Sequence, residues 1–309
     1  MHDLTSQAIA SQNAVRKEYD RVSHLFLQPL CWSDWLWAVD TARSRTFELP
    51  SPDGNSFYGM FPVCDMLNHK FGSTTLHLDS RRRVFEVTAA QPFAAGDQVV
   101  ISYGAMGNED LLSVYGFVDD ENDVDAVDIP PAILAEAARG LESVSQESDF
   151  EWAQRVDLLR RRHGDRVYRM FRSGEGEELM EAARILTADR CDFERIAAGP
   201  GGGDWAEPVN LEGECRAWAA AAAVCEKILG RYPTTLEEDE ALLAETQDQV
   251  EWAESDSARG ALERRFSAVL FRALKKALLR EGAERLEYYA RTSQAMGRIL
   301  QSNVMSVIA

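Results

Sequence analysis

The fold of this chain is decided by Phe61-Pro62-Val63-Cys64-Asp65-Met66-Leu67-Asn68-His69 and by Val99-Val100-Ile101-Ser102-Tyr103-Gly104. The β-branched run that opens the second segment predicts a short buried strand, and its last three residues predict a turn. Tyr103 is therefore expected on rigid backbone, with its hydroxyl beyond the end of the strand. In the first segment, apolar side chains alternate with polar ones whose amide and ring nitrogens can bind a polar ligand.

Further motifs lie on both sides of these two segments. Upstream is a Trp37-Ala38-Val39 helix that ends in Ser44-Arg45, and downstream are Asn108, Leu111-Leu112 and Tyr115-Gly116-Phe117-Val118. The C-terminal half contains Tyr232-Pro233-Thr234-Thr235-Leu236-Glu237-Glu238-Asp239. Taken together, the sequence resembles the SET-domain methyltransferases, in the branch of the Rubisco large-subunit lysine methyltransferase and the actin-histidine methyltransferase.

This resemblance implies the site residues and the cofactor. Tyr103 is the implied catalytic residue, and S-adenosyl-L-methionine is the implied cofactor. The residues implied to contact the cofactor are Arg45, Asp65, Asn68, His69, Tyr115 and Phe117. We favour Arg45 over Arg43 because it directly follows Ser44, as the family pattern requires. No metal site is expected, since Asp65 and His69 lack further ligands at metal-binding spacing.

Periodicity divides the chain near Asp128-Ile129-Pro130-Pro131. Before this point, runs at 74–78, 83–88 and 99–102 predict strands separated by turns. After it, apolar residues recur at helical spacing over 211–229 and 262–277, and Thr235 and Glu238 have the spacing of a capping box. We predict an α+β chain: residues 1–128 form the C-terminal portion of a β-rich SET fold, and residues 129–309 form an all-α substrate-binding domain.

Composition narrows the possible partners and compartments. The 309 residues carry a net charge of −18, which argues against nucleic-acid binding because that requires a basic surface. The five cysteines lack CxxC spacing, and the sequence contains no apolar run long enough for a membrane span. We expect a soluble, monomeric intracellular protein of the cytoplasm or nucleus, or of a plastid if the N-terminus is truncated, which binds a protein substrate through its helical domain.

One departure from the family pattern affects the expected activity. Family members begin the SET domain with a Gly-Arg-Gly segment that holds the amino-acid end of the cofactor, and no such segment precedes Asn68-His69 here. We therefore expect a truncated N-terminus and an incomplete cofactor pocket. Three functions remain open: a protein-lysine N-methyltransferase, a protein-histidine N-methyltransferase, and a non-catalytic remnant that binds a protein.

Overall fold

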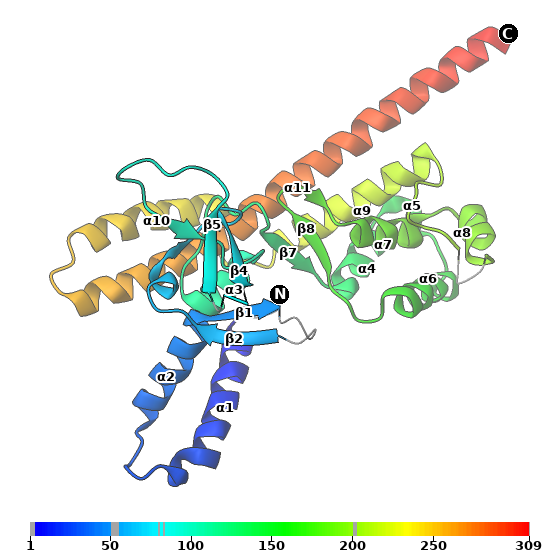
Figure 1. Cartoon of the computed structure of the whole chain (residues 1–309). Helices are drawn as coiled ribbons and strands as arrows, with labels where there is room; N and C mark the ends of the chain where they lie inside the picture. The colour runs from blue at the N-terminus through cyan, green and yellow to red at the C-terminus, as the bar shows by residue number, and fades with distance from the viewer. Residues whose placement is uncertain (1–3, 51–55, 80, 83, 200–202, 309) are drawn as a thin grey trace. The chain divides into compact units, whose positions relative to one another are not determined.

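The chain folds into two compact units, His2–Asn122 and Asp123–Ala309, which we call the N-terminal and C-terminal units (Figure 1). The computed structural model describes residues 4–50, 56–79, 81–82, 84–199 and 203–308. The division falls slightly before the position expected from the sequence. Residues 126–129 belong to the C-terminal unit because they form a strand of its sheet.

The N-terminal unit begins with a helical hairpin and continues as short strand pairs. Its elements are α1 (Leu4–Val22), η1 (Ser23–Leu25), α2 (Trp32–Arg45), β1 (Thr46–Pro50), β2 (Ser56–Met60), η2 (Cys64–Met66), β3 (Asn68–His69), β4 (Thr74–Asp79), β5 (Val84–Ala89), β6 (Val100–Ile101), α3 (Asn108–Asp110) and the π-helical turn η3 (Leu111–Tyr115). The pairs β1–β2 and β4–β5 are antiparallel, whereas β3 and β6 run parallel. The parallel pair joins the two segments that the sequence singled out.

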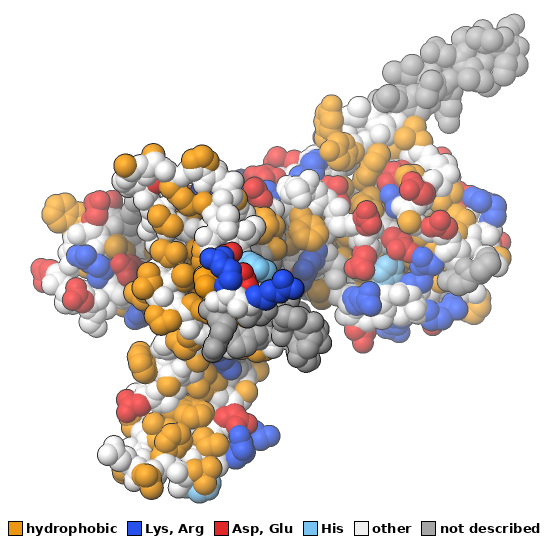
Figure 2. Space-filling view, viewed as in Figure 1, with side chains coloured by type: hydrophobic (Ala, Val, Ile, Leu, Met, Phe, Trp, Pro, Cys, Tyr) orange, Lys and Arg blue, Asp and Glu red, His pale blue; other side chains and the backbone are white. Residues whose placement is uncertain are grey.

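Aromatic side chains make much of the packing in this unit. Phe61 stacks on Phe85 with ring centroids 3.8 Å apart, and Phe47 packs edge-on against Phe61 at 5.6 Å. Between α1 and α2, the hydroxyl of Tyr19 donates to the carbonyl of Leu30 at 2.7 Å. Many large apolar side chains stay exposed, and Figure 2 shows hydrophobic side chains on the surface of both the helical hairpin and the strand region.

The C-terminal unit is largely helical around a small sheet. Its elements are β7 (Ala126–Ile129), α4 (Pro131–Arg139), α5 (Glu142–Ser145), α6 (Asp149–His163), β8 (Tyr168–Phe171), β9 (Gly174–Glu175), α7 (Glu177–Thr187), α8 (Arg190–Ala197), α9 (Leu211–Leu229), α10 (Leu236–Glu251) and α11 (Asp256–Ile308). The three strands form an antiparallel sheet in the order β7-β8-β9. The predicted helices at 211–229 and 262–277 are present, but the sheet shows that the unit is not all-α.

Helix α9 lies at the centre of this unit, against α4, α7 and α11 (Figure 1). Its buried face is rich in alanine, including Ala217, Ala220 and Ala221, and small side chains let neighbouring helices approach closely. Leu279 and Leu286 of α11 are fully buried in the same core. Among the described residues, no helix is both long enough and apolar enough to cross a membrane.

The Tyr232–Asp239 motif encloses a buried lysine. Lys276, only 1% exposed, donates through Nζ to Asp239 Oδ2 at 2.6 Å and to the carbonyl oxygens of Thr234 and Thr235 at 2.6 and 3.0 Å. Arg272 also bonds the Asp239 carboxylate. The predicted capping box is present, with both of its hydrogen bonds formed between Thr235 and Glu238. The motif thus satisfies a buried ammonium group and starts α10.

Candidate functional site

The parallel pairing of β3 and β6 positions the candidate site. Asn68 pairs with Val100 and His69 with Ile101, and the backbone N–H of Lys70 donates to the Ile101 carbonyl at 3.0 Å. Ile101 is completely buried, which anchors β6. Tyr103 follows two residues later, so it lies beside the end of the Asn-His segment.

Beyond β6, side chains replace the sheet as hydrogen-bond acceptors. The backbone N–H of Ser102 donates to Thr74 Oγ1 at 3.0 Å, and that of Tyr103 donates to His69 Nδ1 at 3.0 Å. The N–H of Gly104 donates to Ser102 Oγ at 3.3 Å. Glycine suits this last position because its φ is +119°, a conformation that other residues rarely adopt.

The hydroxyl of Tyr103 donates to the Leu67 carbonyl at 2.7 Å, which fixes the direction of its ring. The ring centroids of Tyr115 and His69 lie 4.7 and 4.9 Å from that of Tyr103, and that of Phe117 lies 6.4 Å away. These four rings form an aromatic cluster contributed by β3, by the segment after β6, and by η3 and the residues that follow it.

All seven residues named from the sequence line one pocket of about 570 Å³. They are Arg45, Asp65, Asn68, His69, Tyr103, Tyr115 and Phe117. The volume is within the range of pockets that bind small molecules, about 300–1,000 Å³. Residues as far apart in the sequence as Arg45 and Phe117 therefore line the same pocket in the N-terminal unit.

Arg45 ties the end of α2 to the turn η2. Its Nη1 donates to the Asp65 carbonyl at 2.8 Å and contacts Met66 Sδ at 2.9 Å, while the Asp65 carboxylate lies 3.9 Å away. Arg43, two residues earlier, instead bonds Ser11 of α1 at 3.1 Å. The structure thus places Arg45 in the pocket and Arg43 outside it.

Partial burial keeps the ring groups of the pocket neutral. Burial raises the pKa of Tyr103 above its usual value, and the nearby Arg45 charge opposes this only in part. Burial, and then Tyr103, raise the pKa of Tyr115. Burial lowers the pKa of His69, against the charge of Asp119. At neutral pH the site therefore presents two phenol hydroxyls and an uncharged imidazole.

Three further residues line the pocket that were not among the predicted site residues: Ser44, Met66 and Gln98. The sequence motifs include the first two, but Gln98 carries no signal in the sequence because it lies in the irregular segment between the turn at residues 95–96 and β6. Val63 begins the turn η2 with a φ of +79°, which is unusual for a β-branched residue. This strained conformation places Asp65 and Met66 at the pocket.

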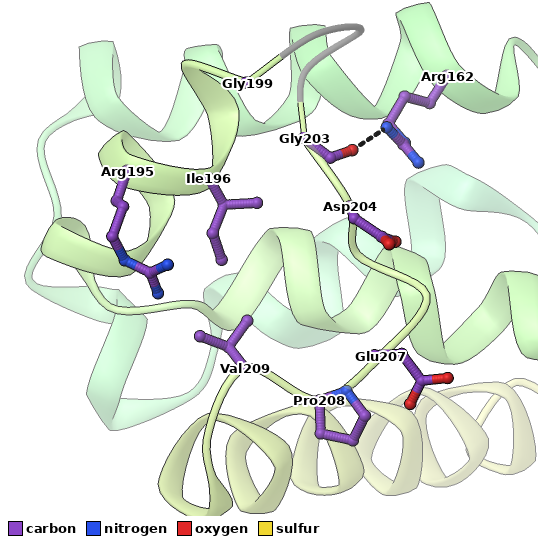
Figure 3. A pocket seen from close by; sticks show the side chains of 9 residues that line it. All are labelled: Arg162, Arg195, Ile196, Gly199, Gly203, Asp204, Glu207, Pro208 and Val209. Atoms are coloured by element: carbon purple, nitrogen blue, oxygen red, sulfur yellow. Dashed lines mark hydrogen bonds between the residues drawn. The ribbon is translucent and has the colours of Figure 1, made fainter.

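A second hollow, of about 720 Å³, lies in the C-terminal unit (Figure 3). It is lined by apolar Ile196, Pro208 and Val209 and by arginines that already have partners. Arg162 donates to the Gly203 carbonyl at 2.7 Å and bonds Glu181, and Arg195 bonds Asp192. The glycine-rich stretch beside it includes residues 200–202, which lie outside the described residues. Because its arginines are engaged, we assign no function to this hollow.

Gly203 at this hollow yields a stability prediction. Its φ is +85°, and a Cβ there would lie 2.1 Å from the Ile196 carbonyl oxygen. We expect Gly203→Ala to destabilise the C-terminal unit by about 1–3 kcal/mol, through backbone strain and this clash. Gly260 inside α11 is the matched control, and its replacement by alanine should stabilise by about 0.5–1 kcal/mol. Urea denaturation of both variants measures the change in the free energy of unfolding. Equal changes in the two variants would contradict a strained and crowded backbone at Gly203.

The comparisons with known proteins agree with this architecture. Residues 141–279 match the family model "Rubisco LSMT substrate-binding". Over 94% of its length the chain superimposes on the crystal structure of the SET domain of LSMT bound to lysine and AdoHcy, with a TM-score of 0.60 and 20% identity. Residues 141–279 are thus similar to the Rubisco LSMT substrate-binding family, and the chain shares the fold of the LSMT SET-domain structure. Its α+β architecture is that of a SET fold followed by a mainly helical LSMT substrate-binding domain.

Sequence relatives of this LSMT-like protein include the actin-histidine N-methyltransferases. The mouse enzyme is 26% identical over 225 residues, and the chicken enzyme is 27% identical over 238 residues. These matches cover 69% and 70% of the chain. The chain spans 36% of the length of each of these relatives and 65% of the LSMT structure.

Proposed function

We propose that this protein transfers a methyl group from S-adenosylmethionine to a side-chain nitrogen of a protein substrate. The observation that carries this proposal is the convergence of the seven site residues, contributed by separate elements, on one pocket. The match of residues 141–279 to the substrate-binding family model supports it, as do the sequence relatives, which are named methyltransferases. A structure of Rubisco LSMT bound to AdoMet also has this fold, with a TM-score of 0.58.

The pocket residues fit the cofactor chemically. An adenosyl group needs flat apolar surface and amide partners, which Phe117, Tyr115 and Asn68 provide at the pocket wall. A zwitterionic amino-acid group needs charges of both signs, which Arg45 and Asp65 provide. We therefore propose that these residues and His69 hold the cofactor.

S-adenosylmethionine, when bound, supplies an electrophilic methyl group on a sulfonium. The chain's own contribution is positioning and water exclusion. Tyr103 keeps its proton at neutral pH and donates it to the Leu67 carbonyl, so its oxygen lone pairs remain available to orient an acceptor N–H. The surrounding rings remove water from the acceptor nitrogen, which favours its uncharged, nucleophilic form.

Two acceptors are compatible with this chemistry. Lysine is the acceptor expected from the sequence resemblance. The curated relatives named actin-histidine N-methyltransferase favour histidine as a second candidate. A neutral imidazole would enter the pocket at pH 7 without losing a proton, whereas a lysine ammonium must first be deprotonated. We propose that the C-terminal unit binds the protein substrate in either case.

The test combines isotope-labelled S-adenosylmethionine, the protein and a cell extract, followed by mass spectrometry of the labelled peptides. The expected product carries a labelled methyl group on a side-chain nitrogen. Labelling of histidine alone would exclude lysine as the acceptor. If calorimetry detects cofactor binding but no peptide is labelled above the level of a Tyr103→Phe control, the result contradicts methyl transfer and favours a non-catalytic protein-binding module.

A further inference from the structure

The hydrogen bond between Tyr103 and His69 defines the chemical state of the imidazole. A backbone N–H can only donate, so the Nδ1 atom that it contacts at 3.0 Å must offer a lone pair. His69 is therefore uncharged, and its proton is on Nε2. A protonated ring would place an N–H on Nδ1 against the N–H of Tyr103, which would break this bond.

This bond replaces a missing step of the sheet. The ladder between β3 and β6 ends with the Lys70 N–H bond to Ile101, and no backbone carbonyl accepts from Tyr103 among the described hydrogen bonds. The His69 ring accepts that N–H from the side and also packs against the Tyr103 ring at 4.9 Å. One side chain thus contacts both the backbone and the ring of the same residue.

We propose that His69 is a positioning residue, whose uncharged imidazole holds Tyr103 in its working orientation. This inference rests on the proposed function for its catalytic meaning, but the geometry can be tested without catalysis. It gives the His69 side chain a role beyond the cofactor contact expected from the sequence. The site becomes sensitive to acid through this ring.

The charged and titratable groups around His69 determine the direction of this sensitivity. Asp119 favours the protonated ring, while burial disfavours it more strongly, so the pKa of His69 lies below its ordinary value of 6.5. The other nearby titratable groups are Tyr103 and Tyr115, which stay neutral, and the Arg45–Asp65 pair. The geometry should therefore be intact near neutral pH and lost as the pH falls below 6.5 through the lowered pKa.

Nuclear magnetic resonance of the full chain tests the ring directly. Long-range imidazole spectra should show His69 with Nε2 protonated and Nδ1 unprotonated, with the resonance assigned by its loss in His69→Asn. The protection factor of the Tyr103 amide should fall about fivefold as His69 is titrated, since one hydrogen bond of this kind contributes about 1 kcal/mol. A proton on Nδ1 at neutral pH would overturn the proposal.

Two variants separate positioning from simple stability. His69→Asn keeps a neutral acceptor near the Nδ1 position, so Tyr103 protection should stay within about twofold of wild type and no longer change between pH 7 and 5. His69→Leu removes the acceptor and should lower Tyr103 protection about fivefold at every pH. An acid-dependent loss in His69→Asn identical to wild type would overturn the proposal.

Thr74→Val is the matched control, because Thr74 accepts the neighbouring N–H of Ser102 but cannot titrate. This variant should lower the protection factor of the Ser102 amide and leave the acid dependence of the Tyr103 protection factor unchanged. The rate of methyl transfer should follow Tyr103 protection across these variants. If no variant, wild type included, transfers methyl groups, the proposed function fails, while the amide data still decide the role of His69.

Discussion

Tyr103→Phe is expected to lower kcat for methyl transfer by about 100-fold or more, because one hydroxyl at the reacting centre orients the acceptor and favours the transition state. The cofactor affinity should change less than about threefold, because the Phe ring keeps the packing against Tyr115 and His69. The variant also leaves the Leu67 carbonyl without its donor, which costs about 1 kcal/mol of stability. For the full chain, mass spectrometry of the methylated product measures kcat, and calorimetry measures the cofactor affinity.

Tyr58→Phe is the matched control for this experiment. Tyr58 belongs to the same unit and is 62% exposed. Its hydroxyl donates to Glu48 at 2.8 Å, and it is not among the residues that line the pocket. Its removal should leave kcat unchanged. An equal loss of rate in both variants, or full activity in Tyr103→Phe, would show that the Tyr103 hydroxyl does not act at the reacting centre.

Asp239→Ala should destabilise the C-terminal unit by about 3–5 kcal/mol, because it leaves a buried charge without its partner. Asp239 is completely buried, and Lys276, which bonds it, is 1% exposed. The backbone carbonyls of Thr234 and Thr235 still accept from Lys276, but they carry no full charge. Urea unfolding followed by tryptophan fluorescence measures the loss.

Glu240→Ala is the control on the same helix, since Glu240 is exposed, and it should shift stability by less than about 0.5 kcal/mol. Burial opposes ionisation of Asp239, but hydrogen bonds from Arg272, Lys276 and Thr234 outweigh it and hold its pKa at about 2. Its contribution should therefore be complete above its ordinary pKa of 3.8 and disappear as the pH falls through about 2. A wild-type acid transition unchanged in Asp239→Asn would contradict this.

The sequence predicted those parts of the fold that depend on local pattern. The periodicity of 211–229 matches α9, and the spacing of Thr235 and Glu238 matches a capping box that is formed. The apolar runs at 74–78 and 83–88 correspond to β4 and β5. In each case, the signal and the structure that it predicts lie within one stretch of chain.

Features that depend on distant partners were not predicted. The strand β7 pairs with β8 across the three intervening helices α4, α5 and α6, and each strand is only four residues long. Gln98 reaches the pocket only because β6 pairs with β3. The bond from the Tyr103 N–H to His69 depends on a side-chain acceptor, which no periodicity encodes. The site residues themselves were found because their spacing follows a known family.

The short parallel contact between β3 and β6 also has a kinetic consequence. Asn68 can meet Val100 only after the chain between them has turned back on itself, and the β4–β5 hairpin forms from that same stretch. Closing such a loop costs conformational entropy, and the short β3–β6 pair makes only a few interactions to offset that cost. We expect the hairpin to form first and the two halves of the pocket to join late in folding. Mild heating should then separate them early, exposing residues 62–70 to proteases while the helical core remains folded.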